Sequence, residues 1–251
     1  MTPPTSLVFR RELHGTVGST NDLARDAAGR GEPEGLWVVA RRQTAGRGRH
    51  GRSWESPEGN LYGSLLLRPE RPLQELATLS LVMALAVAEA TEALSLGSLR
   101  PRVKWPNDVL IGGAKFSGIL LESGNDGRTG SFLIAGLGVN LCHHPADPSR
   151  PSTSLTAEGC EGIGVERFLT ALEPPLEALY RTWQQDGFAS LRERWLARAA
   201  GLGEEVGFRA GPTARTGRFV DLGADGTLKL ADAAGRVESL AAGELFFGPG
   251  R

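Results

Sequence analysis

The sequence predicts an α+β domain followed by a small all-β module. Up to about residue 200, strand-like apolar runs and helical segments follow one another in irregular order, which is typical of a mixed sheet covered by helices. After Ala200 the pattern changes to short strand-like runs separated by turns that contain glycine, which suggests a small barrel. The length of 251 residues suits one large and one small domain, and we expect them at residues 1–200 and 201–251.

The expected domain at residues 1–200 holds the longer elements. Ser19 to Asp22 offers N-caps for a helix with alanines and a leucine at helical spacing, and Pro72 opens an Ala-rich helix that runs to about Leu94. Turns are expected at Gly112-Gly113 and at Asn125-Asp126-Gly127. Apolar runs predict strands at Glu12–Val17, Leu36–Ala40, Leu61–Leu67, Arg102–Trp105, Val109–Ile111, Lys115–Ser123 and Phe132–Val139, and amphipathic spacing predicts helices at Val165–Gln185 and Phe188–Ala199.

The remaining segments complete the outline of the chain. Residues 142–160 are polar and rich in proline and serine, which predicts a long loop. Three tryptophans, Trp37, Trp183 and Trp195, are expected to pack in the core rather than to contact a ligand. Strands of the second module are expected at Val206–Arg209, Thr216–Leu222, Thr227–Leu230, Arg236–Leu240 and Glu244–Phe247.

Composition excludes several classes of protein. A formal net charge of -1 argues against a chain that binds nucleic acid or membranes through bulk charge. The two cysteines, Cys142 and Cys160, form no CxxC pair, which fits a reducing compartment. The N-terminal residues contain no apolar run long enough for a signal peptide, and nowhere do 18 apolar residues run together. We therefore expect a cytoplasmic protein without a membrane span.

Residues 41–52 read RRQTAGRGRHGR and follow directly on a predicted strand. The glycines permit positive φ, so successive backbone amides can form an anion-binding nest, and the arginines add forked donors that suit carboxylate or phosphate oxygens. The spacing matches neither a Walker loop nor a dinucleotide fingerprint. From this run alone, a solvated basic loop or a nucleic-acid contact is an equal alternative. The residues concerned are Gly46, Gly48 and Gly51 with Arg47, Arg49 and Arg52.

The segment VKWPND, residues 103–108, places polar side chains at a bend. Trp105 precedes a proline and is expected to be extended, and Asn107 and Asp108 can bind a hydroxyl, an amide or a hydrated metal ion. Lys115 follows on the return strand of the hairpin beside Gly118, where it could meet a phosphate oxygen. A plain turn and an exposed edge lysine are the alternatives for the two features.

Two later segments are less specific. The strand that ends in GLGVN, residues 136–140, contains two glycines, which indicate either close approach of a ligand or tight sheet packing. Cys142-His143-His144 cannot direct three adjacent side chains comfortably at one zinc ion, so a surface loop is the preferred interpretation. The chain shows no Ser/His/Asp or Cys/His signature of a covalent nucleophile.

Taken together and in this order, the segments resemble the biotin–protein ligases over most of residues 15–155. The long Arg/Gly run and KWPND are the specific parts of the resemblance. The matching segments are Ser19-Thr20-Asn21, Gln43 to Arg52 followed by Trp54, Asn60-Leu61-Tyr62, Lys104 to Asp108, Lys115 to Leu120, and Gly136 to Asn140.

The resemblance implies a class II aminoacyl-tRNA synthetase-like catalytic domain with a mixed sheet and helices, and a C-terminal SH3-like barrel. Such an enzyme uses ATP and Mg²⁺ to convert biotin to biotinyl-5'-AMP with release of pyrophosphate. It then transfers biotin to one lysine of the biotin carboxyl carrier protein of acetyl-CoA carboxylase. Biotin and ATP with Mg²⁺ are then substrates, no prosthetic group is expected, and no nucleic acid or membrane partner is implied.

The resemblance also assigns roles to individual residues. Arg47, Arg49 and Lys115 would offset the repulsion between two anions and stabilise charge on the α-phosphate. Asp108 is a candidate for holding Mg²⁺, and no metal ligand is certain. The biotin side would comprise Ser19, Thr20, Asn21, Gln43, Gly46, Arg47, Arg49, Tyr62, Lys115, Gly118, Gly136 and Gly138. The nucleotide side would comprise Arg49, Arg52, Trp54, Asn107, Asp108, Lys115 and Asn140.

Further expectations concern the variable features of the family. Residues 46–53 are expected to be mobile without ligand and to order over the adenylate, because a mixed anhydride must be shielded from water. Ser19-Thr20-Asn21 comes so early that we expect no N-terminal DNA-binding domain of the kind that some members carry. The pair Phe116-Ser117 is expected to adjust the biotin slot. Family members are monomers or dimers joined at sheet edges, so a homodimer stays open.

Three rival functions stay in view. A lipoate–protein ligase shares the fold and the adenylate chemistry, although GRGRHGR and KWPND favour biotin. A nucleic-acid-binding module could be built on the arginines, but near-neutral charge and a lack of interleaved aromatic residues argue against it. A non-catalytic biotin-binding protein is the third alternative, and the presence of Arg49 and Lys115 argues against it.

Overall fold

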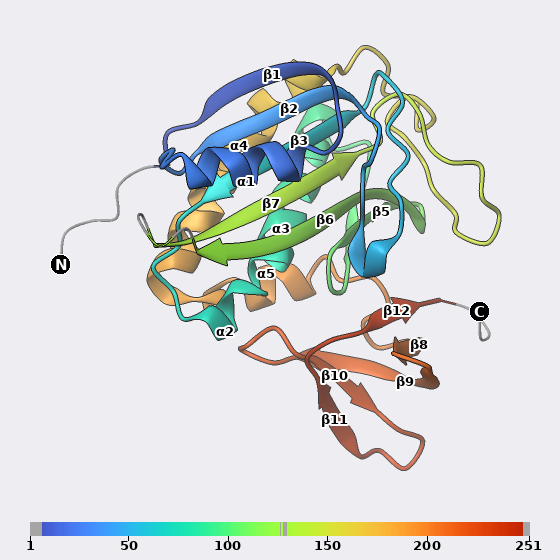
Figure 1. Ribbon diagram of the computed structural model, residues 1–251. Helices are drawn as coiled ribbons and strands as arrows, with labels where there is room; N and C mark the ends of the chain where they lie inside the picture. The colour runs from blue at the N-terminus through green and yellow to red at the C-terminus, as the bar shows by residue number, and fades with distance from the viewer. Residues whose placement is uncertain (1–6, 126, 128–129, 248–251) are drawn as a thin grey trace.

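Two β-sheets organise the chain, and helices cover the larger one (Figure 1). The computed structural model describes residues 7–125, 127 and 130–247. Asp126, the middle residue of one predicted turn, lies outside the described residues.

The larger sheet is mixed, as predicted. Its seven strands lie in the order β1-β2-β3-β7-β6-β5-β4, with β1 and β2 parallel and every other neighbouring pair antiparallel. All of its strands were expected at nearly these positions, because apolar runs end at Gly, Pro and Asn residues. The strands are β1 (Arg10–Val17), β2 (Leu36–Gln43), β3 (Leu61–Leu67), β4 (Arg102–Lys104), β5 (Asp108–Ile111), β6 (Ala114–Asn125) and β7 (Ser131–Val139).

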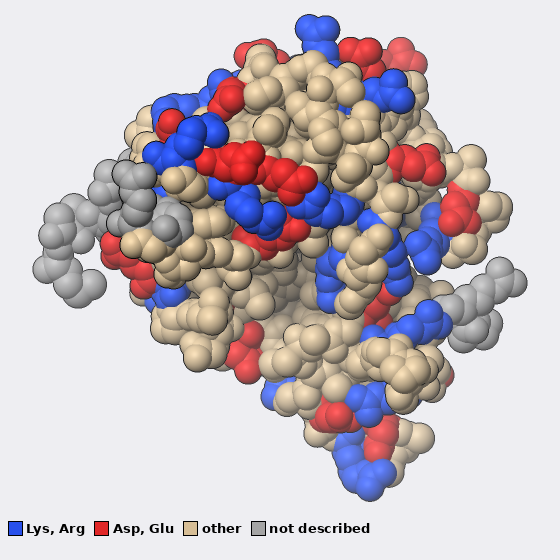
Figure 2. All heavy atoms as spheres, in the orientation of Figure 1, with Lys and Arg blue, Asp and Glu red and all other residues tan. Residues whose placement is uncertain are grey.

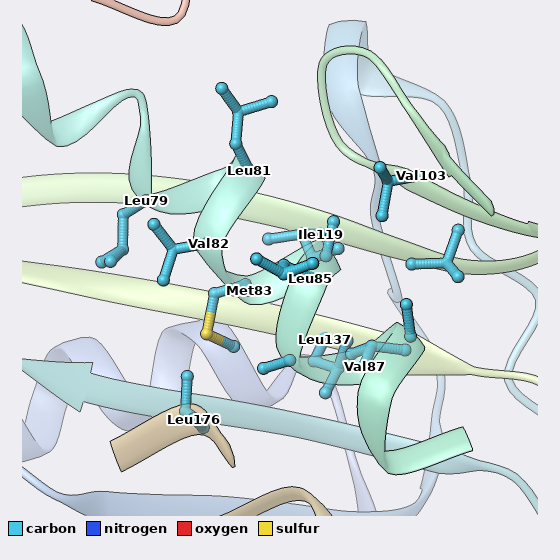
Figure 3. Close-up of a cluster of buried hydrophobic side chains, with 14 of the residues drawn as sticks. Leu79, Leu81, Val82, Met83, Leu85, Val87, Val103, Ile119, Leu137 and Leu176 are labelled. Atoms are coloured by element: carbon cyan, nitrogen blue, oxygen red, sulfur yellow. The ribbon is translucent and has the colours of Figure 1, made fainter. Parts of the chain in front are cut away.

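Helices lie on both faces of this sheet (Figure 1). On β2, Val38 packs in the cluster with Ala24 of α1, whereas its neighbour Trp37 faces the main core, because successive strand residues point to opposite faces. Figure 3 shows the main core, in which leucines and valines of α3 meet β-sheet residues and Leu176 of α4. The helices are α1 (Thr20–Gly29), α2 (Leu73–Leu76), α3 (Leu79–Leu94), α4 (Val165–Asp186) and α5 (Arg192–Leu196).

The α2–α3 segment is long and strongly apolar. Leu73–Leu94 is long and apolar enough to cross a membrane by length and composition, with a mean hydropathy of 1.5 in its most apolar window. However, 78% of that window is buried inside the protein, which makes it a core helix. The predicted core tryptophans Trp37, Trp183 and Trp195 are likewise fully buried, which confirms that prediction.

Two helix predictions need correction. The helix expected from Pro72 to Leu94 divides at Thr78, whose hydroxyl donates to the carbonyl of Glu75 at 2.6 Å and accepts from the indole of Trp183 at 2.8 Å. The helix expected at Phe188–Ala199 is instead a 3-10 turn (Phe188–Ser190) followed by the short α5. Its last residues leave the helix because Ala200 donates its N–H to the carbonyl of Val103 at 2.8 Å.

The second sheet is antiparallel and packs against the larger sheet and its helices. Its order is β11-β10-β9-β8-β12, and all of the expected strands are present. Phe208 and Leu245 join the same core cluster as the helices, and the buried indole N–H of Trp105 donates to the carbonyl of Gly226 at 3.0 Å. The strands are β8 (Glu205–Ala210), β9 (Thr213–Leu222), β10 (Leu228–Ala231), β11 (Val237–Leu240) and β12 (Glu244–Phe246).

The loop at residues 142–160 is partly buried. It contains no helix or named strand, as predicted, but Thr153, Ser154 and Leu155 are at most 5% exposed. The N–H of Lys115 donates to the carbonyl of Pro151 at 2.8 Å, and the N–H of Thr153 donates to the carbonyl of Lys115 at 2.9 Å. The loop therefore extends the hairpin beside Lys115 and brings residues 145–152 to the candidate site.

Candidate functional site

A cavity of about 680 Å³, the central cavity, lies between the larger sheet and the second sheet. Figure 2 shows a recess between the two parts of the molecule, with Lys and Arg side chains along its edge. Nearly all of the predicted site residues line it, although they come from distant parts of the chain. They are Ser19, Thr20, Asn21, Gln43, Arg47, Arg49, Arg52, Trp54, Asn107, Asp108, Lys115, Gly118, Gly136, Gly138 and Asn140.

Two predicted residues, Gly46 and Tyr62, do not line the central cavity. The Tyr62 side chain is buried and its hydroxyl donates to the carbonyl of Pro57 at 2.7 Å, so burial raises the pKa of Tyr62 to about 12. A Cβ at Gly46 would lie only 2.6 Å from the carbonyl oxygen of Trp54. Both residues therefore shape the protein around the cavity rather than its surface.

The N-terminal end of α1 forms a buried polar network with β2 and β3. The Gln43 side-chain carbonyl accepts from the backbone N–H of Thr20 at 2.9 Å and from its hydroxyl at 3.1 Å. The Ser64 hydroxyl lies 2.5 Å from Oδ1 of Asn21 and 2.7 Å from the hydroxyl of Thr20. Nδ2 of Asn21 is buried and has no partner among the described residues, so it is a donor available to a ligand with a carbonyl oxygen.

Glycines of β6 and β7 form a floor against which the side chains of Trp54, Asn21 and Lys115 lie. A Cβ at Gly138 would lie 2.5 Å from the ring of Trp54, and a Cβ at Gly136 would lie 2.3 Å from Oδ1 of Asn21. At Gly118 the nearest atoms would be the ring of Trp54 and Nζ of Lys115, both at 3.1 Å. The glycines therefore permit close approach of side chains of the protein itself, and close approach of a ligand stays a prediction.

Residues 46–53, the Arg/Gly loop, form a narrow hairpin. The N–H of Gly48 donates to the carbonyl of Arg52 at 2.7 Å, and the N–H of Trp54 donates to the carbonyl of Gly46 at 2.9 Å. The left-handed backbone falls at Gly51 (φ 71°) and at His50 (φ 56°). Of the glycines predicted to permit positive φ, only Gly51 uses that freedom.

Arg47 is held by two carboxylates. Its guanidinium forms a bidentate pair with Asp22 of α1 at 2.5 and 3.0 Å and contacts Glu122 of β6 at 3.3 Å. These hydrogen bonds raise the pKa of Arg47 and lower the pKa of Asp22. Arg25 of α1 also pairs with Glu122 at 2.7 Å, so the four side chains form a network without net charge. A ligand carboxylate must therefore compete with acids of the protein for Arg47.

Arg49 and Arg52 connect the Arg/Gly loop to its surroundings. Arg49 donates to Oδ1 of Asn107 at 3.1 Å and to the carbonyl of Gly243 at 3.2 Å, and burial lowers its pKa. Arg52 forms a bidentate pair with Glu244 at 2.8 Å, which lowers the pKa of Glu244 to about 2. Arg49 thus reaches the cavity without a carboxylate partner among the described residues.

Lys115 lies between the glycine floor and β5. Its Nζ is 2.6 Å from Oδ1 of Asp108 and 5.4 Å from the centroid of the Trp54 ring. The register between β5 and β6 shifts after Val109, just before the residue that lies opposite Lys115.

Phe116 and Ser117 follow Lys115 in the chain. The Phe116 ring is fully buried against Phe168. The Ser117 hydroxyl is also buried and donates to the carbonyl of Gly138 at 2.8 Å. Neither Phe116 nor Ser117 lines the cavity, so an effect of this pair on a biotin slot would have to act through neighbouring residues and stays a prediction.

The two asparagines of the predicted nucleotide side are engaged with backbone. Nδ2 of Asn107 donates to the carbonyl of Ile119 at 2.7 Å, which fixes the bend of KWPND against β6. Nδ2 of Asn140 donates to the carbonyl of Thr153 at 3.0 Å and holds the 142–160 loop.

Sequence reasoning passed over several residues that line the central cavity. Lys104 belongs to the KWPND motif, but the motif alone indicated no role for it. Glu244 of β12 and Phe247, which follows β12, also line the cavity. Arg150 comes from the loop that was expected only to connect elements. The signal for Lys104 was its place in the motif, whereas nothing in the short strands after residue 200 indicated that they reach the site.

The described residues include no group of three or more His, Cys, Asp or Glu side chains that could hold a metal ion. His144, in the Cys-His-His segment, lies 3.2 Å from the Ser154 hydroxyl through Nδ1. Asp108, the sequence candidate for a metal ligand, pairs with Lys115 in the structure, and its role as a ligand stays a prediction.

Comparison with known proteins identifies the class that this fold and site define. Residues 16–140 match the model of the biotin/lipoate A/B protein ligase family. A relative from Paracoccus denitrificans, named biotin–[acetyl-CoA-carboxylase] ligase, is 41% identical over 84% of this chain and 90% of its own length. The chain therefore belongs to the biotin/lipoate A/B protein ligase family.

Within that family, other similar proteins are also named biotin ligases. A biotin–[acetyl-CoA-carboxylase] ligase from Mycobacterium tuberculosis is 33% identical over 91% of this chain and 85% of its own length. A biotin protein ligase from Aquifex aeolicus, solved in complex with biotin and ATP, superposes with a TM-score of 0.82 at 29% identity, covering 94% of this chain and 97% of that one.

Proposed function

We propose that the protein is a biotin–protein ligase that acts on the biotin carboxyl carrier protein of acetyl-CoA carboxylase. A carboxylate oxygen of biotin attacks the α-phosphorus of ATP, the bond to the bridging oxygen breaks, and biotinyl-5'-AMP and pyrophosphate form. The ε-amine of one carrier lysine then attacks the acyl carbon, loses a proton, and displaces AMP to leave an amide.

One observation carries this proposal: the cationic side chains of Arg49 and Lys115 and a glycine floor meet in a single cavity. Lys115 connects the two, since its ammonium group lies over the Trp54 ring and close to Gly118 of the floor, and pairs with Asp108 on β5. A reaction between two anions needs fixed positive charge close to a slot that aligns the attacking carboxylate. The segments that resemble the ligases supply both features to the same space.

The polar network favours biotin over lipoate. The ureido group of biotin presents a carbonyl oxygen and two N–H groups, whereas the dithiolane ring of lipoate presents none. The buried Nδ2 of Asn21 needs an acceptor, and the Thr20 and Gln43 side chains lie beside it. A site built for hydrogen bonding discriminates against a ligand that leaves its polar groups unpaired.

On the nucleotide side, Arg49 and Lys115 would stabilise charge that develops on the α-phosphate. The Trp54 ring, which lies on the glycine floor, would contact the nucleotide. Mg²⁺ would arrive with ATP and neutralise phosphate charge, with Asp108 as its candidate protein ligand. The chain's own residues orient the reactants and exclude water, and no side-chain nucleophile is required.

The wider architecture supports several further parts of the proposal. The mixed sheet with helices on both faces suits a class II synthetase-like catalytic domain at residues 1–200, and the five antiparallel strands suit an SH3-like module at 201–251. The buried apolar helix and the two cysteines without a CxxC pair suit a cytoplasmic enzyme. β1 is an edge strand of the larger sheet, and its outer side pairs with no other strand among the described residues. A homodimer would form by strand pairing at this edge.

Release of pyrophosphate tests the proposed reaction. We expect the protein to release pyrophosphate from ATP when biotin is present and not when lipoate replaces it. Lys115→Ala should reduce the rate about a hundredfold or more, as removal of a group that stabilises a charged transition state does. Lys229→Ala, on β10 away from the central cavity, is the matched control and should leave the rate unchanged. Release with lipoate instead of biotin would assign the protein to the other branch of the family.

A further inference from the structure

Lys104 is a cation for which the structure offers no acidic partner. It is the last residue of β4 and lines the central cavity. Its Nζ lies 5.6 Å from the centroid of the ring of Phe247, the residue that follows β12 of the second sheet. Among the described residues, none forms an ion pair or hydrogen bond with this ammonium group. Lys104 is half-buried, and a charge that is partly removed from water without a partner is costly, so an anionic ligand at this place would stabilise it.

The two carboxylates that face Lys104 are each committed to another cation. Oδ1 of Asp108 lies 2.6 Å from Nζ of Lys115, and Glu244 holds Arg52 at 2.8 Å through both of its oxygens. Burial lowers the pKa of Lys104, Asp108 and Glu244 oppose that shift, and Lys115 and Arg52 add to it. The charges around Lys104 therefore leave a positive excess.

The sheet order shows where this excess lies relative to the reacting atoms. The glycine floor is on β6 and β7, Asp108 begins β5, and Lys104 ends β4, the next strand outward. The backbone of Lys104 lies opposite that of Asp108 in the β4–β5 register, and the Asp108 side chain contacts Lys115. A row of phosphates whose α-phosphate meets Lys115 would thus continue toward Lys104 and Phe247.

Residue usage points to a specific need for lysine here. Lysine and arginine together number 28, yet the chain contains only three lysines, Lys104, Lys115 and Lys229. Two of these three line the central cavity. A lysine ammonium is a compact charge with three donors on a flexible stem, which suits binding of a phosphate oxygen in a confined space.

We propose that Lys104 is a further catalytic residue that binds the pyrophosphate leaving group. This inference rests on the proposed function. As the biotin carboxylate oxygen bonds to the α-phosphorus, the bridging oxygen leaves with the electron pair of the broken bond. The Lys104 ammonium stabilises the resulting charge on pyrophosphate by charge and hydrogen bonding and transfers no proton.

Binding of inorganic pyrophosphate to the full chain tests the assignment without relying on catalysis. Isothermal titration calorimetry would compare pyrophosphate and AMP on the wild type, Lys104→Met and Lys229→Met. We expect Lys104→Met to weaken pyrophosphate binding about tenfold or more, as loss of a charged hydrogen bond does, and to leave AMP binding unchanged. The Lys229→Met control should match the wild type, because the Lys229 ammonium contacts Ser239 on the second sheet.

A conservative variant separates the ligand role from a structural one. Lys104→Arg keeps the charge and should recover much of the pyrophosphate affinity, whereas a merely structural lysine would give equal loss in both variants. Unchanged pyrophosphate affinity in Lys104→Met, equal weakening of AMP, or no pyrophosphate binding by the wild type would overturn the proposal.

A second readout distinguishes this proposal from the proposed function. In pyrophosphate release with biotin, Lys104→Met should lower kcat about tenfold or more while the biotin KM stays unchanged. A wild type that binds pyrophosphate through Lys104 but releases none with biotin would refute the biotin ligase reaction and leave the anion site in place. An unchanged kcat in an active enzyme would overturn the catalytic role of Lys104.

Discussion

At the scale of single residues, the structure changes the interpretation of Arg47. The resemblance to the ligases places Arg47 on the biotin side of the site as a cation that offsets anionic repulsion, and the structure shows that Asp22 and Glu122 already hold its guanidinium. Glu122 lies 75 residues further along the chain, so no local pattern could reveal the contact. The motif predicted the type of side chain at the site, and the tertiary fold determined how much of its charge is available.

We expect Asp22→Asn to lower the KM for biotin about two- to fivefold, because the ligand carboxylate then has one charged competitor fewer at a partly exposed ion pair. Steady-state pyrophosphate release at varied biotin concentration measures the effect. Asp232→Asn, which breaks the Arg236 pair on the second sheet, is the matched control. A higher KM in Asp22→Asn would show instead that Asp22 is needed to position Arg47.

At the scale of elements, the glycines on β6 and β7 lie where side chains of the protein approach the sheet closely. What the sequence left open was the identity of the approaching group, because Trp54 lies 84 residues before Gly138 in the chain and meets it only in the fold. The division between α2 and α3 was missed for a similar reason. The apolar pattern is continuous from Leu73, and the hydrogen bond from Trp183 to Thr78 spans 105 residues.

Gly138→Ala tests whether the floor must be bare. A Cβ there would lie 2.5 Å from the Trp54 ring, so the indole must move, and overpacking of this kind costs about 1–3 kcal/mol. We expect a loss of biotin-dependent pyrophosphate release together with a lower melting temperature. Gly15→Ala on β1 is the control, since a Cβ there would meet no atom within 4 Å. Full activity in Gly138→Ala would mean that the indole is free to leave the floor.

At the scale of the whole molecule, the second sheet is part of the site. The strand pattern after residue 200 predicted a compact all-β module, and the structure has the expected strands. Their role at the central cavity could not be predicted, because it depends on the docking of β12 against the Arg/Gly loop. The pair Arg52–Glu244 and the contact of Arg49 with Gly243 make that connection. The mobility expected for residues 46–53 stays a prediction, and any opening of the loop must break these contacts.

The Arg52–Glu244 pair gives this connection a defined pH dependence. The pKa of Glu244 is lowered from its ordinary value of 4.5 to about 2, chiefly by hydrogen bonding to Arg52. A lowered pKa in the folded state means that the pair stabilises the protein above the ordinary value and that this stabilisation is lost as the pH falls toward 2.

We therefore expect Glu244→Gln to reduce the free energy of unfolding at neutral pH by up to about 1 kcal/mol, as for a partly exposed ion pair. The difference from the wild type should shrink steadily as the pH falls below 4.5. Urea unfolding at a series of pH values measures it, with Glu204→Gln as a surface control. A difference that is the same at every pH would show that the pair contributes through packing rather than charge.

The formation of biotinyl-5'-AMP in the central cavity is the central claim of this account. The most direct measurement is native mass spectrometry of the full chain after incubation with biotin, ATP and Mg²⁺ and without any acceptor protein. We predict one bound biotinyl-5'-AMP per chain in the wild type and none in Lys115→Ala. Bound ATP and biotin that stay unreacted in the wild type, or an adenylate formed from lipoate and not from biotin, would contradict it.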